Sequence, residues 1–164
     1  MNLTELTDPA LRAANTAIAV EDGKALIPAP LPELLKEMFE VMYETDGVGL
    51  AAPQVGYNLQ VFIYDDRRGN SGVFLNPTLI MAPPGRMRTL SVHPEGCLSL
   101  PGVSAELSRA SLAMVQGFDE DGNPKQVVGE GFLARIFQHE CDHLNGALFI
   151  DRLSTKARKN ALAA

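Results

Sequence analysis

Apolar side chains recur at helical spacing in two stretches of the chain. In residues 32–45 they lie three or four positions apart, as in a helix with one buried face, and they are Leu34, Leu35, Met38, Val41 and Met42. Residues 132–144 repeat this pattern, and Asn145-Gly146 then follows, a pair favoured at the C-terminal end of a helix. The spacing therefore predicts two amphipathic helices.

Shorter segments elsewhere in the chain have the composition of strands. They are bounded by Gly, Pro, Asp and Asn, and they cover residues 59–65, 73–80, 87–92, 111–118 and the region of 126–128. Residues 148–151 indicate one more short strand, and Ser154 is placed to cap a last short helix. We expect an α+β fold in which antiparallel strands surround the central helix of residues 132–144.

The length and charge of the chain narrow the class of protein. Its 164 residues suit a single domain, residues 1–164, and no run approaches the ~20 apolar residues of a membrane helix. Its 20 acidic and 14 basic residues disfavour a nucleic-acid binder, because phosphate binding depends on Lys and Arg. There are two cysteines and no segment typical of a secretory or mitochondrial signal, so we expect a cytoplasmic protein with reduced thiols.

The second predicted helix carries the motif H-E-x-x-H. His139 and His143 are four residues apart, so on a helix both imidazoles can reach one metal ion. Glu140 lies at the edge of that face, beside a metal-bound water, where a carboxylate acts as a general base. An ordinary helix could carry these residues by chance, but the chain has only three histidines and two of them are here. The motif predicts metal-assisted hydrolysis.

A catalytic site of this kind needs a third protein ligand and an open position for water. No His, Glu or Cys follows His143, and Asp151 is the one downstream carboxylate. The strongest upstream candidate is Cys97, which lies between a glycine and a turn-like segment. A small metalloprotease, the alternative enzyme, would need a downstream ligand. A non-catalytic module with a structural metal would need neither Glu140 nor Gln54.

Three motifs, in order along the chain, make it resemble the peptide deformylases. Residues 47–54 read GVGLAAPQ, residues 95–99 read EGCLS, and the third motif is the H-E-x-x-H segment. Weaker similarity extends over residues 8–153. The resemblance implies an α+β enzyme that removes the formyl group from the N-terminal methionine of newly made proteins with a divalent metal ion.

The resemblance also implies a role for each residue of the metal site. Cys97, His139 and His143 would hold the ion, for which ferrous iron is favoured and zinc, nickel or cobalt are alternatives. Glu140 would act as the general acid and base. A thiolate donates more electron density than a third imidazole, so the bound water is less acidic and the nearby carboxylate becomes more important.

The substrate contacts follow from the same resemblance. The side-chain amide of Gln54 and the backbone N–H of Leu98 would bind the formyl oxygen. Gly49 and Gly96 would let the substrate backbone approach closely. The side chain of the substrate methionine would lie in an apolar pocket lined by Val48, Phe132 and Ile136.

The implied partners are formyl-methionyl nascent polypeptides, with no membrane and no specific nucleic acid. A basic tail would also allow a transient contact with the ribosome, although a solvated helix face is the simpler interpretation; its residues are Arg152, Lys156, Arg158 and Lys159.

Other residues near the motifs suggest structural roles. Cys141 is expected to face away from the metal as a buried core cysteine. His93 is expected on a pocket wall or at the surface. Glu95 is expected to pair with a base such as Arg109, and we favour Asp142 as a partner that orients a ligand over a charge on the helix surface.

Overall fold

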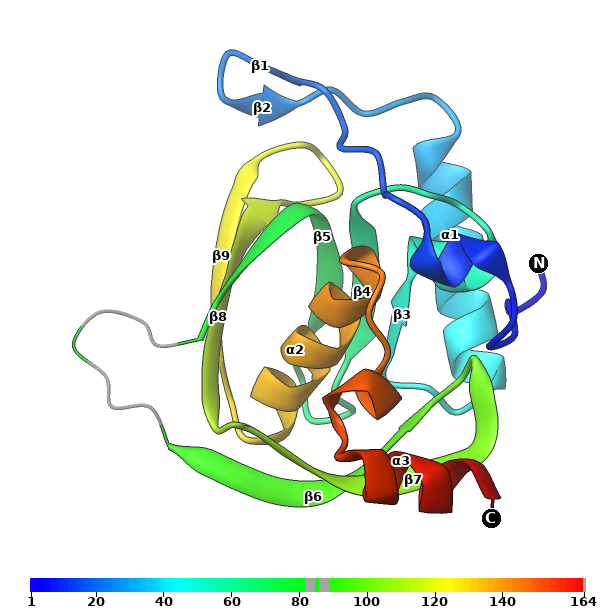
Figure 1. The fold of residues 1–164 in the computed structure, drawn as a ribbon. Helices are drawn as coiled ribbons and strands as arrows, with labels where there is room; N and C mark the ends of the chain where they lie inside the picture. Colours follow the sequence, from blue (N-terminus) through cyan, green and yellow to red (C-terminus); the bar gives the residue numbers. More distant parts are fainter. Residues whose placement is uncertain (82–84, 86–88, 164) are drawn as a thin grey trace.

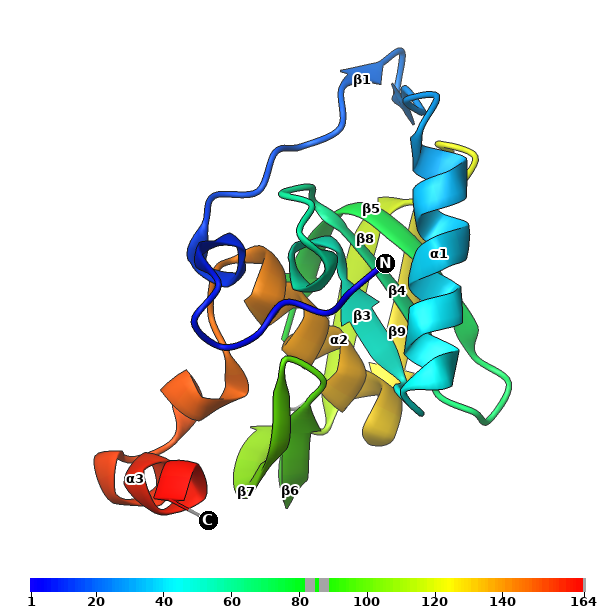
Figure 2. The ribbon, with the colours of Figure 1, turned by 90° about the vertical axis from the view of Figure 1, so that its right-hand side faces the viewer.

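The computed structural model describes residues 1–81, 85 and 89–163, and a five-stranded antiparallel sheet forms its centre (Figure 1). In spatial order the strands are β3 (Gly49–Ala51), β4 (Val61–Asp65), β5 (Ser71–Ile80), β8 (Leu112–Phe118) and β9 (Pro124–Glu130). Two helices, α1 (Leu31–Glu44) and α2 (Phe132–Leu144), lie on opposite faces of this sheet (Figure 2). The predicted α+β fold around the motif helix is confirmed.

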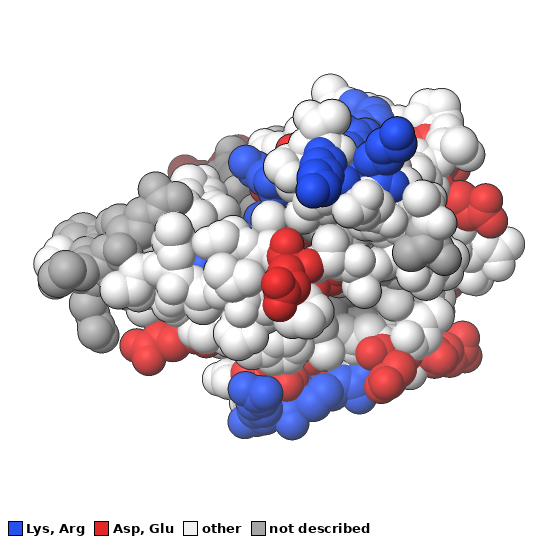
Figure 3. All heavy atoms as spheres, turned by 60° about the horizontal axis from the view of Figure 1, so that its bottom comes forward, with Lys and Arg blue, Asp and Glu red and all other residues white. Residues whose placement is uncertain are grey.

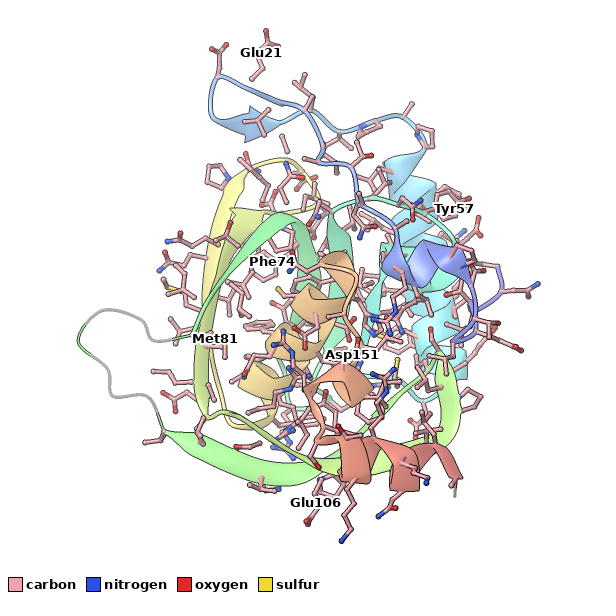
Figure 4. The ribbon with its side chains drawn as sticks, viewed as in Figure 1. Glu21, Tyr57, Phe74, Met81, Glu106 and Asp151 are labelled. Carbon is pink, nitrogen blue, oxygen red and sulfur yellow. The ribbon has the colours of Figure 1, made fainter. Side chains whose placement is uncertain are left out.

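Strand β4 shows how the sheet separates two apolar cores. Successive side chains of a strand point to opposite faces. Val61 and Ile63 therefore pack with α1, whereas Phe62 and Tyr64 pack with α2. Phe74 of β5 extends the second core (Figure 4). Because both faces are covered, β4 is apolar along nearly its whole length.

Helix α1 agrees closely with its prediction. All of its buried residues are apolar: Leu31, Leu34, Leu35, Met38, Val41 and Met42. Pro32 lies in the first turn, where its missing N–H costs no hydrogen bond. The helix ends at Glu44, and Asp46 then adopts a positive φ of 54°, which turns the chain toward β3. The end of α1 thus leads directly into the first of the three sequence motifs.

A second antiparallel unit, made of β6 (Leu90–Cys97) and β7 (Leu100–Ala110), crosses below α2 in the view of Figure 1. Leu100 and Leu107 of β7 pack with residues 148–150 in a third apolar core. This hairpin holds the second sequence motif close to the helix that carries the third.

Several segments differ from the prediction, and in two of them a specific contact is the cause. Residues 148–151 form no strand; η3 (Phe149–Arg152) is a short 3-10 helix, because the Asp151 carboxylate accepts a hydrogen bond from the N–H of Leu148 at 2.8 Å and closes the turn. Strand β7 escapes prediction because Pro101-Gly102 resembles a turn, and pairing with β6 creates the strand. The strand predicted at 87–92 is seen from Leu90, and residues 87 and 88 lie outside the described residues.

The remaining elements are short. They are η1 (Pro9–Arg12), β1 (Val20–Glu21), β2 (Lys24–Ala25), η2 (Ala52–Val55) and α3 (Thr155–Ala163). Ser154 caps α3 as predicted, since its Oγ accepts a hydrogen bond from the N–H of Ala157 at 3.2 Å. Across the described part of the chain, every helix falls short of the length and apolarity needed to cross a membrane.

Candidate active site

Helix α2 and the end of β6 bring three metal-binding side chains together. His139 and His143 lie one turn apart on α2, with their Nε2 atoms separated by 3.2 Å. The Sγ atom of Cys97, the last residue of β6, lies 3.3 Å from Nε2 of His143. All three ligand atoms lie within 4.8 Å of one another. The three residues named from the sequence therefore form one cluster.

The cluster has spacing and charge that suit a divalent ion. Nitrogen and sulfur ligands of a tetrahedral ion lie about 3.3–3.6 Å apart, close to the distances found here. Burial lowers the pKa of His143, and the charge of His139 lowers it further, so this imidazole is neutral and able to ligate. Burial also lowers the pKa of His139, but Cys97 and Glu95 outweigh it and raise that pKa well above its usual value. The surroundings of His139 thus favour a positive charge, and a metal ion bound there would supply one.

Glu95 on β6 orients the first histidine. Its Oε1 lies 2.6 Å from Nδ1 of His139, which leaves Nε2 facing the cluster. Arg109 and Arg135 also donate hydrogen bonds to this carboxylate. Burial raises the pKa of Glu95, but the hydrogen bonds from His139 and Arg109 outweigh it and lower the pKa to about 2. The sequence predicts the pairing with Arg109 but not the contacts with His139 and Arg135.

The ion-pair network continues outward through Asp142. Its carboxylate accepts hydrogen bonds from Arg109 at 2.7 Å and from Arg152 at 2.6 Å. A chain of charged groups therefore runs from His139 through Glu95 and Arg109 to the surface. No hydrogen bond joins Asp142 to a residue of the cluster in the described structure, so any orienting effect on a ligand passes through Arg109 and Glu95.

Glu140 lies beside the cluster and not within it. The residue is 3% exposed, and its Oε2 atom is buried without a hydrogen-bond partner among the described residues. Burial raises the pKa of Glu140 to about 7, against the opposing charge of His139. A carboxyl group with a pKa near neutrality can both accept and release a proton.

Gln54, on η2, directs its amide toward the cysteine. Its Oε1 accepts a hydrogen bond from the N–H of Ala51 at 2.9 Å. This turns Nε2 toward Sγ of Cys97, at 3.5 Å, and Oγ of Ser99, at 3.4 Å. Leu98 follows Cys97 at the tip of the β6–β7 hairpin. Both groups that the resemblance assigns to the formyl oxygen therefore adjoin the cysteine.

A cleft of about 790 Å³ opens beside these groups. All of the predicted site residues line it except His143, which is buried. Val48, Phe132 and Ile136 contribute an apolar part of the wall. His93 is exposed on β6 and does not line the cleft, so it is a surface residue.

Comparison with known proteins decides the family. The sequence profile described as polypeptide deformylase matches residues 1–159. The chain belongs to the peptide deformylase family.

Several deformylases illustrate the similarity. Peptide deformylase of Mycobacterium marinum is 43% identical over 162 residues, which cover 94% of this chain and 81% of that protein. Peptide deformylase 1 of Streptomyces avermitilis is 49% identical over 138 residues, 82% of this chain and 63% of that protein. The crystal structure of a peptide deformylase from Legionella pneumophila matches with a TM-score of 0.87 and 34% identity, covering 99% of this chain and 90% of that chain. The crystal structure of a peptide deformylase from Synechococcus elongatus in complex with actinonin matches with a TM-score of 0.86 and 37% identity, covering 99% of this chain and 84% of that chain.

Metal-dependent deformylation is the known activity of the deformylase family, so the predicted class of hydrolase is confirmed. The metalloprotease alternative requires a ligand downstream of His143. Within the described residues, the Cys-His-His cluster contains none.

Some contributors to the deformylase cleft escape prediction from sequence. Residues 3–5 line it, and the N–H of Thr4 donates a hydrogen bond to the carbonyl of Gln54 at 2.8 Å. Arg135 and the buried Ser99 line it as well. Ser99 lies two residues from the predicted cysteine ligand, which is a usable local signal. The N-terminal segment carries no such signal, because only folding brings it to the site.

Proposed function

We propose that this cleft removes the formyl group from formyl-methionyl nascent polypeptides and that Cys97, His139 and His143 hold one divalent metal ion. The buried Glu140 carboxylate, in the same cleft as the ligand cluster, supports this most directly. A purely structural metal site would need no such carboxylate. We further propose that residues 1–164 form one catalytic domain that acts in the cytoplasm.

Glu140 would carry the proton transfers of hydrolysis. A divalent ion at the cluster would act as a Lewis acid and make a water molecule acidic enough to serve as the nucleophile. Glu140 accepts a proton from water as the water oxygen bonds to the formyl carbon. It then gives a proton to the amide nitrogen as the C–N bond breaks, leaving formate and a free methionyl amine.

Gln54 and the backbone N–H of Leu98 would stabilise the negative charge that grows on the formyl oxygen. The Gln54 amide is already oriented, because Ala51 holds its Oε1. Its N–H groups therefore need little rearrangement during the reaction.

The apolar wall of Val48, Phe132 and Ile136 would receive the methionine side chain. Gly96 would let the substrate backbone pass close to the hairpin. A formyl carbon carries only hydrogen, so we expect backbone crowding at this point to exclude the methyl group of an acetylated peptide.

We favour ferrous iron as the native ion, with zinc, nickel or cobalt as alternatives. One thiolate and two imidazoles suit each of these ions, and availability then decides between them. Anaerobic purification followed by metal analysis identifies the ion.

A transient ribosome contact is proposed for the exposed basic residues at the end of the chain, Arg152, Lys156, Arg158 and Lys159. On the face shown in Figure 3, basic side chains gather in two separate groups with acidic side chains between them. A local basic group can bind ribosomal RNA even in a chain with a net charge of −6.

The function is tested with formyl, acetyl and unblocked peptides of one sequence, assayed on protein purified without oxygen. We expect rapid formate release from the formyl-methionyl peptide and very slow hydrolysis of the acetyl peptide. The unblocked peptide should stay intact, because a chain on both sides of the carbonyl would not fit. Efficient internal cleavage of that peptide would contradict the proposal and favour a protease.

The two cysteines form a matched pair for the ligand assignment. Cys97→Ser should weaken metal binding, because a neutral alcohol is a poor ligand where a thiolate is used. Cys141→Ser should leave metal binding nearly unchanged, since this thiol is buried in the core and burial raises its pKa. Metal content is measured for both purified proteins. The reverse pattern would mean that the third ligand is misassigned.

A further inference from the structure

Gly49 lies directly against the carboxylate of Glu140. A Cβ atom added to Gly49 would be 2.4 Å from Oε1 of Glu140, 2.9 Å from Cδ and 3.0 Å from Cγ. All three nearest atoms belong to this one side chain. The space left by the missing side chain of Gly49 is therefore occupied by the Glu140 carboxylate.

The backbone conformation does not explain the glycine. Gly49 is absent from the residues with positive φ, so an L-amino acid could adopt its backbone angles. The position is also well held, because Gly49 pairs with Tyr64 of β4 and the carbonyl of Val48 accepts a hydrogen bond from Asp65 at 2.9 Å. A glycine inside a strand often marks a close approach by another group, and here that group is Glu140.

Packing contributes to the orientation of the Glu140 carboxylate, because Oε2 is buried and has no hydrogen-bond partner in the described part of the chain. The residue is 3% exposed, so solvent does not define its orientation either. Its close packing against Gly49 is therefore a contact that can set the distance between this carboxylate and the ligand cluster.

We propose that Gly49 is a positioning residue for Glu140, a role distinct from letting the substrate backbone approach. The proposal rests on the proposed function of Glu140 as the general acid and base. Gly49→Ala should fold, because the atoms that must move are the end of a side chain and not backbone. To reach an ordinary contact of 3.4 Å instead of 2.4 Å, the carboxylate must shift by about 1 Å. A displacement of that size can lower a rate by up to 10²-fold.

Gly49→Ala is therefore expected to lower kcat by roughly 10- to 100-fold with little change in KM and no loss of metal. The matched variant is Gly96→Ala, which adds the same methyl group to another glycine of the cleft. A Cβ at Gly96 meets only the carbonyl oxygen of Val103, at 3.4 Å, and no part of Glu140. If the substrate backbone passes Gly96 as proposed, this variant raises KM and largely keeps kcat.

A double-mutant cycle with Glu140→Ala separates positioning from substrate contact. Alanine lacks Cγ, Cδ and the carboxylate oxygens, so it removes all three atoms that a Cβ at position 49 would meet. Adding Gly49→Ala to Glu140→Ala should then lower the residual kcat by less than about 3-fold, a clear departure from additivity. Metal content and KM are measured for every variant.

Three outcomes would overturn the proposal: an equal loss of kcat in both backgrounds, an effect of Gly49→Ala on KM alone, or loss of metal in step with activity. Failure of the proposed function looks different. In that case Glu140→Ala keeps full kcat, or the wild-type enzyme loaded with metal releases no formate, and the proposed role of Gly49 is then also wrong.

Discussion

Helices α1 and α2 cover opposite faces of one sheet, but they bury different kinds of side chain (Figure 2). Every buried residue of α1 is apolar. Helix α2 also buries an apolar stripe, and with it five polar or charged residues: Arg135, Gln138, Glu140, Asp142 and His143. Two helices with similar apolar patterns can thus differ completely in function, and the buried polar residues reveal the difference.

Most of the buried polar groups on α2 have partners. The side chain of Gln138 accepts a hydrogen bond from the N–H of Ala110 at 3.1 Å and donates one to the carbonyl of Ala110 at 2.9 Å. Arg135 donates to three acceptors on β6 and β7. The buried side-chain nitrogen and oxygen atoms of α2 left without a partner within the described structure are Oε2 of Glu140 and Nδ1 of His143. Both belong to the proposed reaction centre, so incomplete hydrogen bonding marks the site on this helix.

The largest effect should come from removing the unpaired carboxylate of α2. Glu140→Ala is expected to lower kcat by roughly 10²–10⁴, the usual contribution of a general acid and base. Folding and metal content should be retained, because the carboxylate lies beside the ligands. Formate release and bound metal are measured on the same sample.

The control for this change is on the other helix. Glu40 is an exposed carboxylate of α1 that does not line the cleft, so Glu40→Ala should keep full activity. Loss of metal in step with activity in Glu140→Ala would show that Glu140 is a ligand.

Truncation of the apolar face of α1 should affect stability instead of chemistry. Met38 is 0% exposed, so Met38→Ala should lower the free energy of unfolding by about 2–5 kcal/mol. Turnover per folded molecule should not change, because Met38 does not line the cleft. Urea unfolding and kcat measure the two quantities. A fall in kcat without a loss of stability would break the contrast between the helices.

Acid should weaken the partner network of α2 through Glu95. The pKa of Glu95 is about 2 in the folded protein, against an ordinary value of 4.5. The lower pKa contributes roughly 3 kcal/mol of stability, which is present above pH 4.5 and lost as the pH falls toward 2. Unfolding free energies of the wild-type protein and Glu95→Gln, measured across this range, should converge on the acid side. Parallel curves would contradict this contribution.

The smallest effect is expected at the outer end of the same network. Arg152 contacts Asp142, but its side chain is 54% exposed. Arg152→Ala should therefore cost less than about 1 kcal/mol of stability, as is usual for exposed ion pairs. Metal content should be unchanged. Loss of metal in this variant would show that the network transmits more from the surface to His139 than its exposure suggests.

Much of the fold and of the candidate site could be predicted, because the relevant patterns are short. The apolar stripe of α1 and the i, i+4 pair of histidines depend only on helical periodicity. Prediction failed where a contact overrides the local pattern. Asp151 closes η3 in a segment that resembles a strand, and pairing with β6 makes a strand of a segment that begins with Pro101-Gly102.

The amino-acid order alone thus specified two amphipathic helices, the metal motif and a cysteine suited to complete it, since each is a matter of residue type and short spacing. Tertiary structure alone decided that Glu95 orients His139, that Thr4 binds Gln54 and that Glu140 rests on Gly49. These contacts join residues far apart in the chain. They exist only because β3, β6 and the N-terminal segment pack around α2, and no local pattern encodes that packing.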